Sequence, residues 1–430
     1  MNKNKIIFII IVSLVVVLGI GGTVWYLNNQ IQPQTNTPVT NPVTTTDNGT
    51  GAFPSSDKII PVSTPTNQQN TIDNTAGADT VERVPGEITR KADVGVAGVA
   101  FIDNSFNGAG PLLRYIEKGT GHISDISYDE KIPTKISNTT MTGVFDTVWN
   151  KDASSLIIRR LDGVGNNIQT IYGNLERGFA STTIDGEVGS IVGTILPSSV
   201  KEIAVSPLKD KIFFLSKNGN STIGSISDFN RVGASNKKNQ IFSSAFSDWS
   251  VSWPTTNSIS LVTKPGYNVS GYFYSLGVSN NKLEKVIGDI SGLTTLMSPS
   301  GDKTIYSETT GAGFMTYYTN KSTDYPNIMP ITTLPEKCVW SKINENVVYC
   351  GVPKTTPLAK YPDSWYQGVT SFSDNIYEIN LDTNSARVMI DDQKLGGIEI
   401  DVTNPILSTK EDYLAFINKK DNTPFMVKIR

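Results

Sequence analysis

The chain has 430 residues, a net charge of −3 and 18% charged residues, with no block of basic residues along its length. This charge balance argues against nucleic acid as a partner, because a phosphate-binding surface needs clustered lysine and arginine. A single histidine, His122, and two cysteines, Cys338 and Cys350, supply few ligands for a metal ion. We therefore expect neither a metal nor another cofactor.

The N-terminus contains a candidate membrane anchor. Lys3 and Lys5 lie in residues 1–5, and the 22 residues 6–27 carry no charge, which is long enough for a helix to cross a bilayer. A cleaved signal peptide is the alternative, but its apolar core is shorter, whereas this run continues to the interfacial pair Trp25-Tyr26. Because the lysines precede the span, the sequence predicts a single-pass cell-membrane protein with a cytoplasmic N-terminus and an extracytoplasmic remainder.

Residues 28–84 predict a disordered linker. Asn, Thr, Pro, Gln, Gly and Ser dominate this stretch, and the first charge after Lys5 is Asp47. Such a composition cannot bury enough apolar area to offset the entropy of ordering, and its X-Pro steps keep the chain extended. We expect the linker to carry the folded part, residues 85–430, away from the membrane.

The folded part repeats one unit. An apolar strand ends in a small polar or aromatic residue, a polar loop of about five residues follows, and a second apolar strand begins. The residue before each loop, here called the marker, recurs at 150, 206, 253, 298, 341 and 408, which gives spacings of 43–67 residues. Repeats of this length with four strands are typical of the blades of a β-propeller. With one more repeat over residues 96–138, the sequence predicts an all-β propeller of seven blades, with six or eight as alternatives.

The two ends of the folded part complement each other. The C-terminal repeat, residues 404–429, has only three predicted strands, and residues 88–91 resemble a strand that lacks its own blade. We expect residues 87–92 to close the ring as the outer strand of the last blade, since an open sheet would otherwise expose its edge.

Two repeats are enlarged. The first extra stretch, residues 163–199, is rich in Gly, Ser and Thr and predicts long loops. The second insertion, residues 353–373, is aromatic, and loops of this length in a compact β domain are usually functional or disordered. Tyr361, Trp365 and Tyr366 are its candidate partner-binding residues, because large rigid side chains are typical binding anchors. The alternative is that Trp365 folds back and covers the base of its own blade.

Cys338 and Cys350 are a candidate disulfide. They lie on the first and second strands of one repeat hairpin and are symmetric about Asn344. An antiparallel register centred there places them directly opposite each other, within bridging distance. An oxidising compartment would favour the bridge, and the alternative is that both residues are simply small apolar side chains.

The repeats resemble the TolB-like and WD-like propeller repeats of bacteria, whose hallmark is Trp-Ser-Pro-Asp-Gly before an apolar strand. The similarity is clearest in Ser298-Pro299-Ser300-Gly301 and Ser206-Pro207, while Trp149 and Trp340-Ser341 keep the first half of the motif. Two further segments, Arg114 to Ile123 and Tyr361 to Gly368, look like parts of uncharacterised single-pass propeller proteins of small-genome bacteria. That resemblance implies the same order of anchor, linker and propeller, and no known activity.

The sequence contains no visible catalytic constellation. A Gly-x-Ser-x-Gly elbow is absent, and any Ser-His or Cys-His machinery would have to use His122, which opens a strand in a Gly-Thr-Gly-His turn. We therefore expect a non-catalytic protein-binding or scaffolding module of the cell envelope. A lectin-like propeller that binds a glycan or the cell wall is the alternative, and an envelope hydrolase is a more remote one. A fold alone does not fix a function, so the partner stays open.

Overall fold

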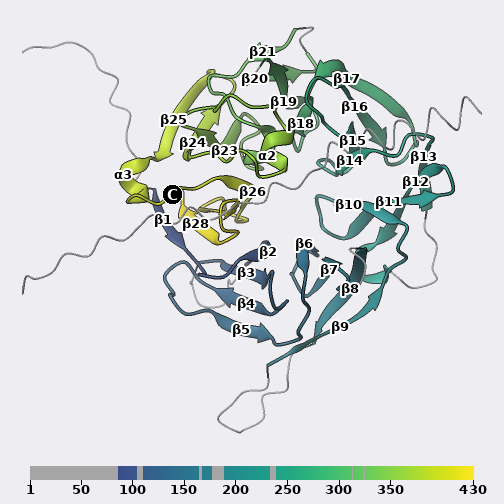
Figure 1. Ribbon diagram of the computed structural model, residues 1–430, viewed down its shortest axis with the longest axis vertical. Helices are drawn as coiled ribbons and strands as arrows, with labels where there is room; N and C mark the ends of the chain where they lie inside the picture. Colours follow the sequence, from purple (N-terminus) through teal and green to yellow (C-terminus); the bar gives the residue numbers. More distant parts are fainter. Residues whose placement is uncertain are drawn as a thin grey trace, which may run out of the picture. The chain divides into compact units, whose positions relative to one another are not determined.

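The computed structural model describes residues 86–103, 110–163, 167–176, 188–232, 239–311, 313–322 and 325–430. In these ranges the strands form seven antiparallel sheets of four strands each, and Figure 1 shows the sheets arranged in a ring. The predicted all-β propeller of seven blades is confirmed. The candidate anchor and the linker lie outside the described residues.

Blades 1 to 6 each consist of four consecutive strands, counted outward from the centre of the ring. Blades 1 to 3 contain β2 (Val96–Ile102), β3 (Leu112–Glu117), β4 (Ile123–Ile126) and β5 (Thr134–Ser137); β6 (Val144–Trp149), β7 (Ser155–Leu161), β8 (Ile168–Glu176) and β9 (Ser190–Ile195); and β10 (Val200–Val205), β11 (Lys211–Asn218), β12 (Ser221–Asp228) and β13 (Asn239–Ser244). Blades 4 to 6 contain β14 (Trp249–Ser252), β15 (Ser258–Thr263), β16 (Ser270–Gly277) and β17 (Leu283–Ser291); β18 (Thr294–Met297), β19 (Lys303–Thr310), β20 (Gly313–Asn320) and β21 (Asn327–Ile328); and β22 (Cys338–Trp340), β23 (Val347–Pro353), β24 (Asp374–Asn380) and β25 (Ser385–Ile390).

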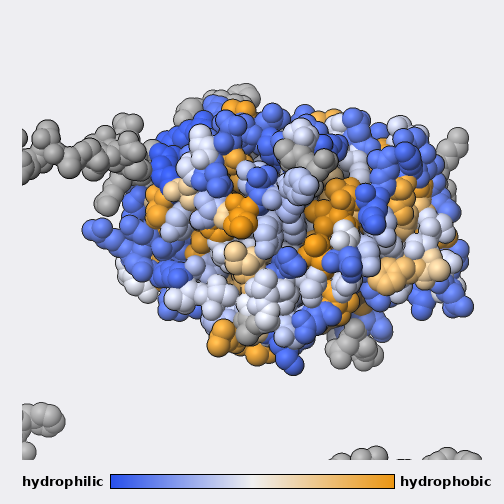
Figure 2. Space-filling view, turned by 90° about the horizontal axis from the view of Figure 1, so that it is seen from above, coloured by the Kyte–Doolittle hydropathy of each residue, from blue (hydrophilic) through white to orange (hydrophobic). Residues whose placement is uncertain are grey.

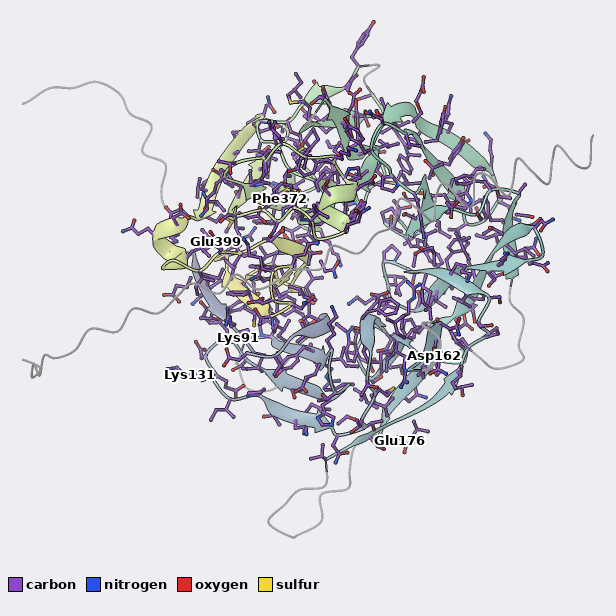
Figure 3. The ribbon with its side chains drawn as sticks, viewed as in Figure 1. Lys91, Lys131, Asp162, Glu176, Phe372 and Glu399 are labelled. Carbon is purple, nitrogen blue, oxygen red and sulfur yellow. A yellow bond between two sulfur atoms is a disulfide. The ribbon has the colours of Figure 1, made fainter. Side chains whose placement is uncertain are left out.

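Blade 7 joins the two ends of the folded part. Its inner strands are β26 (Val402–Leu407), β27 (Tyr413–Asn418) and β28 (Pro424–Lys428), and its outer strand is β1 (Glu87–Arg90), which pairs with β28. Lys91, the next residue, donates hydrogen bonds to the carbonyls of Tyr128 (2.6 Å) and Glu130 (3.0 Å) in blade 1, and Figure 3 shows it at this junction. The expected closure of the ring by the N-terminal strand is therefore confirmed.

The recurring loop is a turn that the marker residue closes with its own side chain. Ser206 Oγ accepts hydrogen bonds from the backbone N–H groups of Asp210 (3.2 Å) and Lys211 (3.0 Å). Asn150, Ser298 and Ser408 likewise accept from the N–H of the fifth residue after them, and Ser341 accepts from the N–H of the third, Asn344. The third residue after the marker adopts a left-handed φ, 56° at Lys209 and 79° at Gly301, so glycine fits this position of the turn without strain.

The core consists of seven apolar clusters, one at each interface between neighbouring blades. Side chains of one strand alternate between two clusters: Leu156 and Ile158 pack against blade 1, whereas Ile157 packs against blade 3. Strands buried on both faces need continuous apolar runs, which explains the apolar triplet after each loop. The side view in Figure 2 accordingly shows hydrophobic side chains in separate patches among hydrophilic ones.

Residues 163–199 differ from the expected long loops, because β8 and β9 run through this stretch. The outer strand β9 is exposed along almost its whole length, so its side chains need not be apolar. Its ladder to β8 comes from backbone groups, which any composition supplies. Residues 177–187, between these strands, lie outside the described residues.

The helices of the described part are single turns: η1 (Phe229–Arg231), η2 (Pro335–Lys337), α2 (Asp363–Tyr366) and α3 (Asp392–Leu395). Within the described ranges, no helix has the length and apolar character needed to cross a membrane.

Ring closure yields a stability prediction. Deleting residues 87–90 removes β1 and its ladder to β28, which exposes the edge of blade 7. We expect the free energy of unfolding of the full chain to fall by several kcal/mol, about 1 kcal/mol per lost ladder bond plus the burial of Ile88. Urea titration followed by tryptophan fluorescence measures this.

The matched control deletes four linker residues, 66–69, and should leave the transition unchanged. Equal midpoints for the two deletions would contradict the role assigned to β1.

Candidate functional site: the axial channel and its cap

The first strands of the seven blades enclose an axial channel of about 800 Å³. This volume lies in the range of pockets that hold ligands in proteins. The wall is largely apolar, and every blade contributes to it. Its apolar lining includes Val148, Val205, Leu296, Met297, Val339 and Ile406.

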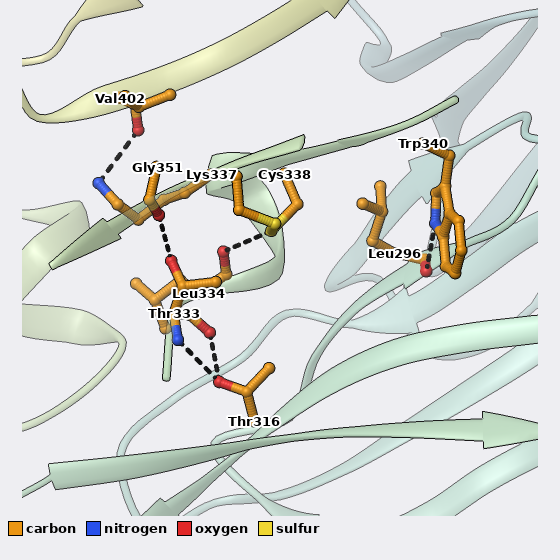
Figure 4. Close-up of a disulfide and its surroundings, with 10 residues drawn as sticks. Leu296, Thr316, Thr333, Leu334, Lys337, Cys338, Trp340, Gly351 and Val402 are labelled. Atoms are coloured by element: carbon orange, nitrogen blue, oxygen red, sulfur yellow. Dashed lines mark hydrogen bonds between the residues drawn. A yellow bond between two sulfur atoms is a disulfide. The ribbon is translucent and has the colours of Figure 1, made fainter. Parts of the chain in front are cut away.

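Three tryptophans at the ends of first strands also line the channel. Trp149, Trp253 and Trp340 belong to blades 2, 4 and 6, and each indole is wedged in the cluster between its blade and the preceding one. Trp340 donates its Nε1–H to the carbonyl of Leu296 (3.2 Å, Figure 4). The indole N–H groups of Trp149 and Trp253 have no hydrogen-bond partner among the described residues.

Charged side chains are few in the channel wall. Asp146 pairs with Arg159 across 3.5 Å, and burial raises the pKa of this carboxyl while the guanidinium opposes the shift. Lys209 and Lys342 stand on the turns that follow the first strands of blades 3 and 6. These turns lie at one mouth of the channel, because the first strands of a propeller run in the same direction. Of these three charged residues, Asp146 has an ion-pair partner, whereas Lys209 and Lys342 have none among the described residues.

The insertion forms a cap that reaches across four blades. In the cap, here residues 354–373, Asp363 accepts a hydrogen bond from the N–H of Tyr267 in blade 4 (3.2 Å). The carbonyl of Tyr361 accepts one from Thr309 in blade 5 (2.9 Å). Figure 1 shows α2 over this part of the ring. A segment of blade 6 is therefore hydrogen-bonded to blades 4 and 5.

The underside of the cap is an aromatic cluster. Tyr361 and Phe372 stack with their ring centres 5.5 Å apart, and both contact Phe314 of blade 5. Trp365 joins this cluster, and Figure 3 shows Phe372 over the inner part of blade 6. The cap is therefore packed as a small hydrophobic core of its own.

A buried ion network holds the cap to blade 7. The Nζ of Lys337, a fully buried side chain, lies 2.5 Å from Asp401 Oδ1 and 2.7 Å from Asp374 Oδ2. Asp401 also accepts hydrogen bonds from the indole N–H of Trp365 (3.1 Å) and the backbone N–H of Phe372 (3.0 Å). One carboxylate thus accepts hydrogen bonds from η2 and from two residues of the cap.

Asp374 is the carboxylate of this network whose hydrogen bonds are incomplete. Its Oδ2 accepts from Lys337 and from the N–H of Val402 (2.7 Å), whereas its buried Oδ1 has no partner among the described residues. Burial raises the pKa of Asp374 to about 6, although the Lys337 ammonium acts in the opposite direction. A carboxylate that is short of one donor in a dry site binds a proton more readily than it does in water.

The three predicted aromatic anchors take different places. Tyr361 is 0% exposed and Trp365 is 2% exposed, so both belong to the core of the cap. Their burial agrees with the alternative in which Trp365 covers its own blade, and it removes them as surface anchors. Tyr366 is 41% exposed, and its hydroxyl donates to Glu336. The sequence could not separate these roles, because the polar partners of Trp365 lie in blade 7.

Cys338 and Cys350 are cross-strand partners in the β22–β23 register and form a disulfide (Figure 4). The bridge lies beside η2 and therefore close to Lys337. His122 stays outside this region. Its Nε2 lies 3.4 Å from Thr140 Oγ1, and its Nδ1 lies 4.0 Å from Glu117. In the portion of the chain described, no three His, Cys, Asp or Glu side chains come together as a metal site.

Comparisons with known proteins address the fold. No family model matches the chain, and no curated protein matches it. Among solved structures, TolB from Acinetobacter baumannii is 12% identical over 68% of this chain and 63% of its own, with a TM-score of 0.39. The matched region thus spans less than two thirds of that TolB chain.

Two oligogalacturonate lyases are also similar. The one from Vibrio parahaemolyticus is 11% identical, with coverage of 80% of this chain and 97% of its own and a TM-score of 0.45. The other, in complex with manganese, is 9% identical, with coverage of 80% and 96% and a TM-score of 0.48. At these sequence identities and TM-scores, the similarity does not bear on the activity or the partner of this chain. The solved structures that resemble the chain do include TolB, as its repeats suggest.

The network predicts a pH dependence of stability. Because the pKa of Asp374 is raised to about 6 in the folded protein, its protonation favours folding. This stabilisation is complete below the unfolded pKa of about 3.9 and is lost as the pH rises through about 6. Relative to Asp374→Asn, which cannot titrate, the wild type should lose about 2–3 kcal/mol between pH 4 and pH 7. Urea unfolding of both proteins at each pH measures the difference.

Asp302→Asn is the matched control, since Asp302 is exposed and pairs only with Lys321. A difference between the wild type and Asp374→Asn that stays constant across this pH range would contradict the raised pKa.

Proposed function

We propose that the chain is a non-catalytic binding module that holds an extended segment of a partner protein in its axial channel. The single observation that carries this proposal is the channel itself, about 800 Å³ with a largely apolar wall built from all seven blades. Because the closed ring already holds this wall in place, binding a partner costs little conformational entropy of the wall.

The rim of the channel supports a protein partner. Leu208 is 60% exposed and Ile343 is 59% exposed, and each is the sequence neighbour of a lysine at the mouth. Exposed apolar side chains beside a cavity extend the area that a macromolecule can bury. A small solute inside the channel would leave them in water.

The glycan-binding alternative has less support. A sugar ring needs the open face of an aromatic side chain, whereas the three channel tryptophans are only 4–6% exposed. Trp365, the fourth candidate, is enclosed by the cap. Peptide side chains can use the remaining apolar wall, so a polypeptide segment matches this site better.

The cellular address is part of the proposal. Residues 6–27 are proposed to remain as an uncleaved anchor, and residues 28–84 to hold the propeller outside the cytoplasm, where the Cys338–Cys350 bridge is stable. The partner would then be a protein of the cell envelope.

Protease treatment of intact cells tests the address. We expect external protease to remove the propeller and to leave a short membrane-bound fragment that starts with the original N-terminal sequence, because the composition of residues 28–84 predicts a linker that is open to cleavage. Cytoplasmic marker proteins serve as the control for cell integrity. A mature chain that starts within residues 20–35 would refute the anchor.

Blocking the channel tests the binding mode. Ser252 lines the channel and is exposed, so Ser252→Trp adds bulk there without entering a blade interface. We expect this variant to retain the wild-type melting temperature and to bind its envelope partner at least about tenfold more weakly. Capture is measured by cross-linking in the native envelope, followed by quantification of the partner.

The controls are Ser252→Ala, which leaves the channel open, and Tyr366→Ala, which alters the exposed side of the cap. Both should capture the partner as the wild type does. If Ser252→Trp captures normally while Tyr366→Ala does not, the partner binds the cap and not the channel.

A further inference from the structure

Two lysines stand at one mouth of the channel. Lys209 and Lys342 both line the channel, and among the described residues no ion pair joins either of them to a carboxylate. A buried acid of blade 7, Glu411, accepts hydrogen bonds from the Ser341 hydroxyl and from the backbone N–H groups of Lys342 and Ile343. Its side chain therefore anchors the turn that presents Lys342.

The position of these lysines is costly for the folded protein. Burial lowers the pKa of Lys209, and the positive charge of Lys342 lowers it further. Lys209 also occupies the left-handed position of its turn, with φ of 56°, where the equivalent residue in blade 5 is glycine. Burial without an ion-pair partner disfavours the charged form of a lysine, and residues perturbed in this way are found more often at functional sites.

Polar groups deeper in the channel wall are also unsatisfied. The indole N–H groups of Trp149 and Trp253 and the hydroxyl of Thr147 line the channel and have no partner among the described residues. These three atoms are buried beneath the surface of the channel, so they mark packing strain in the wall and are not donors open to a bound molecule.

We propose that this mouth recognises an acidic side chain in the partner segment, with the carboxylate held between Lys209 and Lys342 and the adjoining apolar residues inside the channel. The inference rests on the proposed function and specifies the chemistry of the partner. Two lysines that line this mouth and the apolar wall beside them complement a glutamate or aspartate next to apolar residues. The carboxylate would supply the ion-pair partner that neither lysine has among the described residues.

Peptides that differ only in one charge test the inference. The full chain is titrated with an array of N-acetylated, C-amidated decapeptides, each with apolar side chains and one position that is Glu, Gln or Lys. We expect peptides with Glu to bind at least about tenfold more tightly than their Gln partners, as one desolvated charge pair provides. In Lys209→Gln and Lys342→Gln this preference should fall towards unity.

A second readout needs no peptide. Because each substitution removes one of two repelling charges, both variants should melt at or above the wild-type temperature. The matched control Lys321→Gln changes an exposed lysine that pairs with Asp302, and should leave the peptide preference unaltered.

The outcomes are distinct. Equal binding of Glu and Gln peptides would overturn the carboxylate site and leave the channel as a peptide site. The absence of binding by any peptide of the array would overturn both. A competition assay compares the concentrations of octanoate and of unlabelled Glu peptide that displace a bound Glu peptide. Displacement by octanoate at the lower concentration would assign the mouth to an amphiphile and overturn the peptide inference.

Discussion

The closure of the ring is the constraint on which the rest of the structure depends. Each sheet has two apolar faces, and each face is covered only by the blade beside it. Seven blades give seven interfaces only if the last blade meets the first, which occurs where Tyr413 and Ala415 pack against Leu113 and Tyr115. The pairing of β1 with β28 completes the blade that makes this contact. The channel exists because the circle is complete.

The ion network under the cap positions the cap more than it adds to the stability of the fold. Removing Lys337 and its carboxylates from water costs several kcal/mol per ion, and the attraction between them offsets this cost only when the geometry is good. Here Asp401 is fully satisfied and Asp374 is not. What the network adds is direction, because the hydrogen bonds of Trp365 and Phe372 to Asp401 set the position of the cap over blades 6 and 7.

The parts predictable from the sequence are those that local chemistry determines. The marker side chain closes its own turn within five residues, and the apolar triplet after it must be buried on both faces. Both features depend on residues that are close together in the sequence, so the blades and their number can be predicted from the repeat. The register of Cys338 and Cys350 likewise follows from one hairpin.

The cap and the channel mouth depend on residues that are distant in the sequence. Lys337 and Asp401 are 64 positions apart, and Lys209 and Lys342 come from blades 3 and 6. Nothing in the local sequence of Trp365 shows that an acid will accept its N–H, so its exposure could not be predicted. The left-handed position of the repeated turn does not set Lys209 apart either, because Ala153 and Glu411 occupy it in blades 2 and 7.

The short seam between β1 and β28 has a mechanical consequence. The two strands are antiparallel, and the chain enters the ring at Glu87, opposite Lys428, where the ladder begins. Tension on the residues before Gly86 therefore reaches this four-residue ladder first at Glu87. Of all the joints in the ring, this seam receives the pulling force first, and Lys91, with its two bonds to blade 1, stands directly behind it as the next point of resistance.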